Sequence, residues 1–256
     1  MVRYIRAELY KAVRRNYLWG TLTVVIILEG LLVSGYVWGS DMFHMSAGSG
    51  VLAITRLLTL GFYGGVIFSD VVFSDQHKYN TLKNEVSYGL SRTCIYLGKL
   101  VTGWIVSLAS CIALLGFYGL LCMVFLRWDG TGVQAMASVG FALLAALPLW
   151  LGSQAMVIML FFLFQSSVAP TILAIMIISF LGDVLKLAAV LVAGANQLVS
   201  EILLMLCKVT LTAPLANIAN RIGEWDVIPW AWAVGLGWVV VTTAIGLWRF
   251  RKKEIS

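Results

Sequence analysis

Long apolar stretches separated by short polar segments occupy most of the chain. Within them hydrophobic residues continue without the strict alternation of a half-buried strand, and most reach the roughly 20 residues that a helix needs to cross a bilayer. Six such stretches lie at about residues 18–38, 51–73, 95–126, 139–164, from 168 onward, and 229–248. The pattern therefore predicts an all-α polytopic membrane protein with six transmembrane helices.

The segments outside these stretches have patterns of their own. Residues 1–17 are basic, and their apolar residues recur at helical spacing, which predicts an amphipathic helix lying on the membrane surface. That stripe consists of Ile5, Leu9, Ala12 and Val13. Residues 183–227 are mixed in character, and their apolar run at 202–207 is too short to span, which predicts re-entrant or interfacial helices outside the cell, interrupted near Pro214.

Composition agrees with a lipid environment, since 61% of residues are hydrophobic and 12% are charged. Thirteen of the 18 Lys and Arg residues lie in residues 1–17, 78–99 and 249–253. An even number of crossings puts these segments on one side, and the positive-inside rule makes that side cytoplasmic. Both termini are then expected in the cytoplasm. The net charge of +6 thus indicates orientation rather than nucleic-acid binding. We find no internal repeat, so residues 1–256 are expected to form one domain.

Aromatic residues and glycines also fit membrane helices. Six tryptophans lie near predicted helix ends, as is typical of interfacial anchoring: Trp19, Trp38, Trp128, Trp225, Trp230 and Trp248. Two glycine pairs, Gly35 with Gly39 and Gly61 with Gly65, have the four-residue spacing that lets helix backbones approach. The close approach could serve internal packing or contact with a second copy.

Sequence motifs of catalysis are missing from the chain. A phosphate-binding loop would need a glycine where Thr93 stands, five residues before Gly98, and neither a G-x-S-x-G elbow nor an H-E-x-x-H pair occurs. The four cysteines and two histidines lack metal-ligand spacing. The sequence therefore predicts no catalytic, cofactor or metal site, and a protein that is not itself an enzyme.

The polar segment at residues 74–93 and the start of the next stretch carry a resemblance to a known family. In ABC type-2 (ABC-2) transport permeases, the segment after the second crossing has a G-T-L-[KR] run, a small turn with S-R, and a G-K or S-K leading into the third helix. The matching residues here are Thr81, Leu82, Lys83, Gly89, Ser91, Arg92 and Lys99. Asn80 departs from the usual glycine. The size and charge layout of the whole chain are most similar to permeases of bacitracin and lantibiotic immunity-type exporters.

This resemblance implies a permease subunit of an ATP-driven exporter in the bacterial cytoplasmic membrane. Its partners would be ABC ATPase subunits, which bind the ATP, a second permease copy or a paralogue, and membrane lipid. The implied cargo is an amphipathic compound such as an antimicrobial peptide, while its identity and the choice between homodimer and heterodimer stay open. Two alternatives from other classes are an ATP-independent immunity or binding protein and a membrane-embedded enzyme.

The segment at 74–93 also has the pattern of a docking helix. Its apolar residues fall on one stripe, which could lie in the groove of a partner, and the resemblance implies that this partner is the ATPase. The predicted coupling residues are Tyr79, Leu82, Lys83, Val86, Leu90 and Arg92. The simpler alternative is a solvated cytoplasmic loop followed by an ordinary helix start at Ser91.

One acidic residue, Glu29, lies near the middle of the first predicted crossing. An ionised carboxylate in lipid costs a few kcal/mol unless it is paired or wetted, so Glu29 is expected to face protein or water. Arg56 lies at a similar predicted depth, and a Glu29–Arg56 ion pair on the translocation path is one hypothesis. The alternative is a neutral or hydrogen-bonded Glu29 within the bundle.

Overall fold

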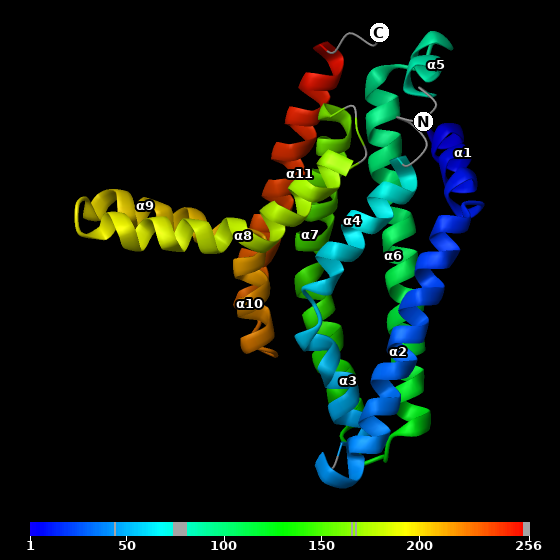
Figure 1. Ribbon diagram of the computed structural model, residues 1–256, viewed down its shortest axis with the longest axis vertical. Coiled ribbons are helices and arrows are strands. Elements are labelled where there is room, and N and C mark those ends of the chain that lie inside the picture. The colour runs from blue at the N-terminus through cyan, green and yellow to red at the C-terminus, as the bar shows by residue number, and fades with distance from the viewer. Residues whose placement is uncertain (44, 74–80, 165, 167, 253–256) are drawn as a thin grey trace.

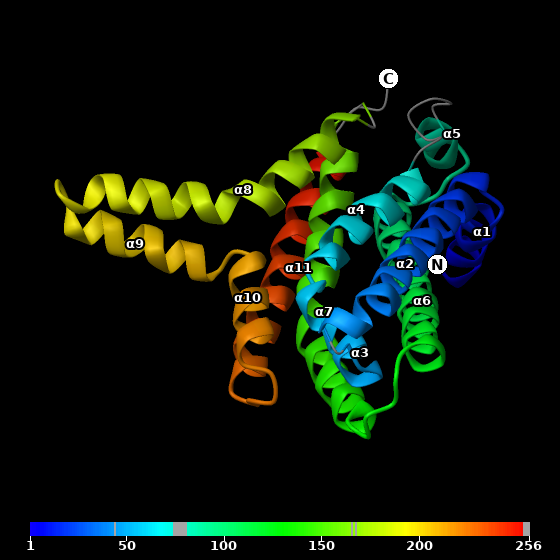
Figure 2. The ribbon, with the colours of Figure 1, turned by 60° about the horizontal axis from the view of Figure 1, so that its bottom comes forward.

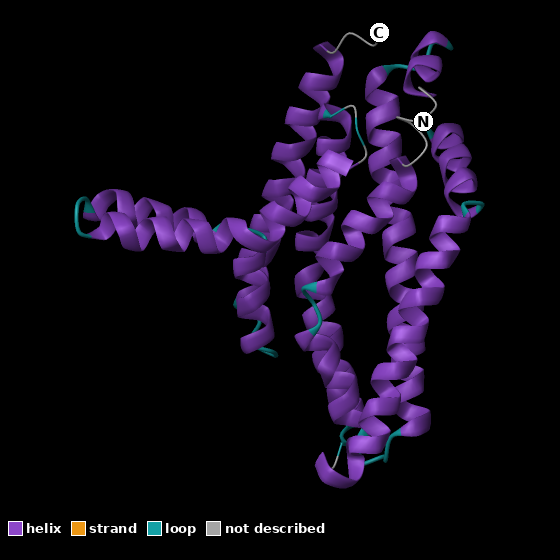
Figure 3. Ribbon diagram, in the orientation of Figure 1, coloured by secondary structure: helices purple, strands orange, loops and turns teal. Residues whose placement is uncertain are grey.

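The computed structural model describes residues 1–43, 45–73, 81–164, 166 and 168–252, and it is built of helices joined by short loops (Figure 3). In chain order the helices are α1 (Val2–Val13), α2 (Asn16–Phe43), α3 (Ala47–Arg56), α4 (Leu60–Phe73), α5 (Thr81–Ser87), α6 (Arg92–Phe125), α7 (Gly132–Leu163), α8 (Val168–Ala193), α9 (Gln197–Lys208), α10 (Thr212–Asn220) and α11 (Val227–Lys252). Among these described residues no strand occurs, only an isolated bridge between Ser46 and Arg127. The predicted all-α class is confirmed.

Five helices, α2, α6, α7, α8 and α11, are long and apolar enough to cross a membrane. Two further pairs, α3 with α4 and α9 with α10, are bent by 66° and 70° and could each be a broken span or a re-entrant loop. The six predicted crossings fall within this range of five to seven. The predicted crossing at 51–73 is two helices instead of one, and α8 continues to Ala193, ten residues beyond the predicted start of the outer segment at 183.

Helix α7 lies at the centre of the bundle, between α3 and α4 on one side and α11 on the other (Figure 1). Pro148 lies inside α7 and has no N–H, so it cannot donate to the carbonyl of Leu144 one turn earlier. The indole N–H of Trp232 on α11 donates to that carbonyl at 3.2 Å. The proline therefore provides a polar link to the neighbouring helix.

Two other tryptophans bond to carbonyls where helices break. Trp150 Nε1 donates at 3.1 Å to the carbonyl of Leu58, in the break between α3 and α4, and Trp238 Nε1 donates at 2.9 Å to that of Val209, between α9 and α10. Backbone groups need internal partners in lipid, so these bonds stabilise the bends. The six tryptophans predicted as interfacial anchors are all exposed.

Helices α8 and α9 form a hairpin that projects sideways from the bundle in both views (Figures 1 and 2). Ser200 Oγ donates to the Ala189 carbonyl at 2.9 Å within the hairpin, and Ser179 joins its base to Tyr63 of α4 through a 2.9 Å hydrogen bond. Large apolar side chains along this arm are exposed, among them Val184, Leu187, Val190, Leu191, Leu198 and Met205. Such a surface requires apolar surroundings.

The start of α1, helix α5 and the end of α11 lie at one end of the bundle, which is the upper end in Figure 1. Just below α5, aromatic rings from four helix ends pack together: Phe73, Tyr96, Phe161, Phe162 and Phe250. Their neighbouring ring centroids are 4.6–5.0 Å apart. This aromatic cluster joins the ends of α4, α6, α7 and α11 and supports the site described next.

Candidate coupling site

The short helix α5 has one face against the bundle and one face exposed. Leu82, Val86 and Leu90 are half-buried and pack against the main core. This differs from the predicted arrangement, in which that stripe faces a partner, because the apolar side chains find a closer apolar surface in their own chain. The exposed face consists of Lys83, Asn84 and Ser87, and the exposed Tyr88 follows directly after the helix. Tyr79 lies outside the described residues.

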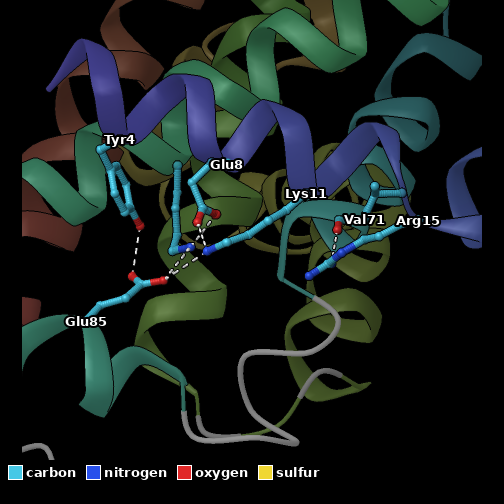
Figure 4. Close-up of polar contacts among 7 residues, drawn as sticks. Tyr4, Glu8, Lys11, Arg15, Val71 and Glu85 are labelled. Carbon is cyan, nitrogen blue, oxygen red and sulfur yellow. Dashed lines mark hydrogen bonds and ion pairs between the residues drawn. The ribbon is translucent and has the colours of Figure 1, made fainter.

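A buried network of charged side chains joins α5 to α1 and α6 (Figure 4). Lys99 of α6, fully buried, donates to Glu8 Oε2 of α1 at 2.8 Å, and Lys11 donates to Glu8 Oε1 at 2.6 Å. Glu85 of α5 accepts a 2.8 Å hydrogen bond from the Tyr4 hydroxyl. Its other oxygen lies 3.8 Å from Lys99 Nζ and 3.9 Å from Lys11 Nζ. Helices α1 and α6 are thus joined tightly, and α5 is attached to both.

The network settles the charge state of Glu8 and Tyr4. Burial by itself would raise the pKa of Glu8, but the attraction of Lys99 and the hydrogen bonds from Lys11 and Lys99 outweigh it, so the pKa of Glu8 lies below its ordinary value of 4.5. Burial, together with the carboxylates of Glu8 and Glu85, raises the pKa of Tyr4. Glu8 is therefore ionised and Tyr4 neutral at physiological pH, as the donor and acceptor roles require.

The matched G-K pair of the sequence, Gly98 and Lys99, lies at the heart of this site. A Cβ atom at Gly98 would come within 2.6 Å of the Tyr4 ring, so glycine lets α1 approach α6. Lys99 Nζ lies 5.7 Å from the ring centres of both Tyr4 and Phe73, and Phe73 belongs to the aromatic cluster. The lysine thus links α1 and α5 to the ends of the long helices.

Comparison with protein-family models gives the family of the chain. Residues 4–182, more than half of the chain, match the family described as ABC-2 family transporter protein, and the match includes every residue of the network. The chain belongs to the ABC-2 transporter family. Members of this family are membrane components of ABC transporters and work with separate ABC ATPase subunits. No curated protein and no solved structure matches the chain.

The turn between α5 and α6 of this ABC-2 protein, together with the first residue of α6, contains three more of the matched residues. Gly89 has a φ of 83°, a left-handed conformation that favours glycine. Ser91 caps α6 by accepting from the Cys94 N–H at 3.3 Å, as expected of an ordinary helix start. The Arg92 guanidinium donates to the Phe250 and Arg251 carbonyls at 2.9 and 2.7 Å. Arg92 thus fixes the start of α6 to the end of α11.

At the other end of α1, Arg15 donates to the Val71 carbonyl near the end of α4 (Figure 4). Helix α1 is therefore held along its length by α6, α5 and α4. Of its predicted apolar stripe, Ala12 is buried and Val13 is 49% exposed. The inner face of α1 is centred on Glu8 and Ala12, so it packs on the bundle through polar as well as apolar groups.

The two residues predicted for the translocation path lie elsewhere in the ABC-2 chain. Glu29 faces a cavity between α2, α4, α6 and α7, and its Oε2 is buried without a hydrogen-bond partner. Arg56 is exposed at the end of α3. Within the described part of the chain these two side chains form no ion pair, because α3 ends at Arg56 and turns away at the 66° bend.

Four members of the network were not predicted from the sequence: Tyr4, Glu8, Lys11 and Glu85. One signal was available, because Glu8 is the single acidic residue in residues 1–17, and Tyr4 and Lys11 share its helix face at spacings of four and three. An acid on the inner face of a basic amphipathic helix requires a cation there. Lys99 is that cation.

Replacing Gly98 with alanine is expected to destabilise the protein by about 1–3 kcal/mol, because the new Cβ forces the Tyr4 ring away and breaks the Tyr4–Glu85 hydrogen bond. Thermal unfolding in detergent measures the loss, and faster proteolysis near the N-terminus reports the release of α1. Gly119 lies on the same helix with nothing within 4 Å of its Cβ position, so Gly119→Ala is the matched control. Equal stability of both variants would contradict this packing.

Proposed function

We propose that this chain is the permease subunit of an ATP-driven exporter and that α5 transmits the movement of a separate ATPase subunit to the transmembrane helices. The observation that carries the proposal is the position of Lys99, which is fully buried and bonded to α1 while facing Glu85 of α5. A force on α5 therefore reaches α1 and α6 through charged groups. Through Phe73 it reaches the aromatic cluster.

The exposed face of α5 meets the ATPase, and the largest exposed side chains there are Lys83 and Tyr88, which follows directly after the helix. Tyr88 is 88% exposed. Arg92 supports coupling without facing the ATPase, because it fixes the start of α6 to α11. The coupling role of Leu82, Val86 and Leu90 is then to fix α5 to its own bundle. In this proposal α5 and both termini lie in the cytoplasm of a bacterial cell, as the positive-inside rule requires.

A second permease copy or a paralogue completes the transporter. The α8–α9 arm, with its exposed apolar side chains, supports this part of the proposal because it extends beyond the bundle, where a second copy and lipid can cover it. The cargo we propose is an amphipathic compound, such as an antimicrobial peptide, moved outward from the cell or the membrane. The permease itself binds no cofactor and draws on ATP through its partner.

Co-purification of the permease with its ATPase subunit tests the proposal. Changing Lys83→Glu together with Tyr88→Asp is expected to reduce the recovered ATPase at least tenfold, since both side chains are exposed and the charge of the docking face is reversed. Thermal stability of the permease should stay unchanged. Arg127→Glu, an exposed position between α6 and α7 at the opposite end of the bundle, is the matched control.

If the doubly substituted permease retains the ATPase, α5 is not the docking helix. If the unmodified chain recovers no ATPase and supports no ATP hydrolysis, the result contradicts the exporter proposal. It would favour the two alternatives, an ATP-independent immunity or binding protein and a membrane-embedded enzyme.

A further inference from the structure

A cavity of about 390 Å³ lies within one copy of the chain, between α2, α4, α6 and α7. Helix α2 contributes residues at positions 21, 25, 28, 29 and 32, a spacing that follows one helical face. Glu29 is therefore on the side of α2 that faces the bundle. Helix α2 packs mainly on α6, so α2 alone forms the wall on its side of the cavity.

The walls are mostly apolar, with two polar atoms that lack partners. Glu29 Oε2 and Gln154 Nε2 are both buried without a hydrogen bond, and Gln154 as a whole is 2% exposed. Both residues line the cavity, one from α2 and one from α7. A buried polar group without a partner costs on the order of 1–3 kcal/mol, so the two groups indicate that something absent from this chain satisfies them.

The charge of the walls selects the sign of that ligand. Among the described residues that line the cavity, Glu29 is acidic and none is Lys or Arg. Arg56, the cation that the sequence places at a depth similar to that of Glu29, is exposed at the end of α3 and does not line the cavity. A carboxylate in apolar surroundings favours a cation beside it.

The cavity opens on the outer surface of the bundle. Leu28 of α2 and Leu60 of α4 line the cavity and are each 58% exposed. Both lie on the outer surface of helices that are long enough, singly or as a bent pair, to cross the membrane. A hydrophobic molecule dissolved in the bilayer therefore has a direct path to Glu29.

We infer that this cavity binds one hydrophobic monovalent organic cation, which enters from the bilayer and is held by Glu29, with the Gln154 amide beside it. The inference rests on the proposed transport function, and it narrows the proposed amphipathic cargo to a small organic cation in place of a peptide. A volume of about 390 Å³ is at the lower end of the roughly 300–1,000 Å³ of small-molecule sites, so it suits a small amphipathic amine or onium ion rather than a whole peptide.

Two probes of nearly equal size and opposite charge test the inference. Radiolabelled tetraphenylphosphonium, a cation, and tetraphenylborate, an anion, are added to the full chain with its ATPase in lipid nanodiscs, and binding to empty nanodiscs is subtracted. The cation is expected to bind saturably at one site per permease, and the anion is not. Glu29→Gln should weaken cation binding at least tenfold, as expected for the loss of a charged contact.

Two further variants separate the carboxylate from general packing. Glu29→Asp keeps the charge and should restore most of the cation binding that Glu29→Gln loses. Glu201→Gln removes an exposed acid on α9, far from the cavity, and should bind the cation like the native chain. Equal binding of both probes, or native cation binding by Glu29→Gln, would overturn the inference.

The same preparation keeps this inference separate from the proposed function. If the co-purified ATPase hydrolyses ATP but no cation binding depends on Glu29, the cavity assignment is wrong and the proposed permease function stands. Cation binding that depends on Glu29, in a chain that recruits no ATPase, supports the cavity assignment and removes ATP-driven export.

Discussion

Replacing Gly235 with alanine is expected to separate α11 from α7 and to destabilise the protein by about 3 kcal/mol, at the upper end of the cost of overpacking. A Cβ atom at Gly235 would lie 2.5 Å from the Pro148 carbonyl oxygen and 2.7 Å from the Leu149 nitrogen. Both are backbone atoms of a helix, so they cannot rotate away as a side chain would. The helices must move apart or the variant must unfold.

The control for this substitution is two residues further along the same helix. Gly237 is exposed, with nothing within 4 Å of its Cβ position, so Gly237→Ala should keep or slightly raise stability through its higher helix propensity. Thermal unfolding in detergent compares the two. Matching unfolding temperatures would show that α7 and α11 do not approach as closely as described.

The contact at Gly235 matters because it lies beside the proline of α7. As the helices separate, Trp232 loses its hydrogen bond to the Leu144 carbonyl, and that carbonyl has no N–H at Pro148 to return to. The cost of overpacking is then increased by that of an unsatisfied backbone group. We therefore expect the close contact at Gly235 and the hydrogen bond of Trp232 to be lost together.

The sequence predicted the helical class and the positions of most long helices because apolar length is a local property that lipid requires. The bend between α3 and α4 could not be predicted in the same way. No proline marks it, and it depends on Trp150, which follows 92 residues after the Leu58 carbonyl that it bonds. The glycine that makes room for the ring, Gly61, was noticed for its spacing but could not be assigned a neighbour.

The same distinction between local signals and contacts distant in sequence applies to the candidate site. The family motif located α5, the turn and Lys99, since these residues are adjacent in sequence. Which side of α5 faces outward depends on competition between the bundle and a partner for Leu82 and Val86, and an amphipathic pattern alone does not decide it. The partners of Lys99 on α1 were missed because surface helices in membranes are expected to present basic and apolar faces, with no acid turned inward.

Removing the buried cation by Lys99→Met is expected to cost about 3–5 kcal/mol of stability, the range measured when one partner of a buried ion pair is lost. Glu8 then keeps only Lys11, which is half exposed, and Glu85 loses the nearer of its two cations. Chemical unfolding in detergent measures the loss. Lys186→Met on α8 is the control, because its ion pair with Asp183 is exposed and should contribute nothing measurable.

A double substitution separates the ion pair from simple packing. Glu8→Gln with Lys99→Met should cost clearly less than the sum of the two single changes, because no uncompensated charge stays buried between them. Exchanging the two residues should not restore stability. A glutamate at position 99 would face Glu85, and a lysine at position 8 would face Lys11. Strict additivity of the single changes would contradict the coupling of Glu8 and Lys99.

The pH dependence of stability gives this network an independent signature. The pKa of Glu8 in the folded protein is below its ordinary value of 4.5, so its carboxylate stabilises the fold fully above pH 4.5 and progressively less as the pH falls through the lower folded value. Glu8→Gln should lack this acid-sensitive contribution.

If the network also transmits movement, Lys99→Met should keep the ATPase bound at the outer face of α5 but uncouple ATP hydrolysis from transport, since docking uses Lys83 and Tyr88 while transmission uses the buried charges. A variant that is destabilised yet transports at the native rate per ATP would restrict Lys99 to a structural role.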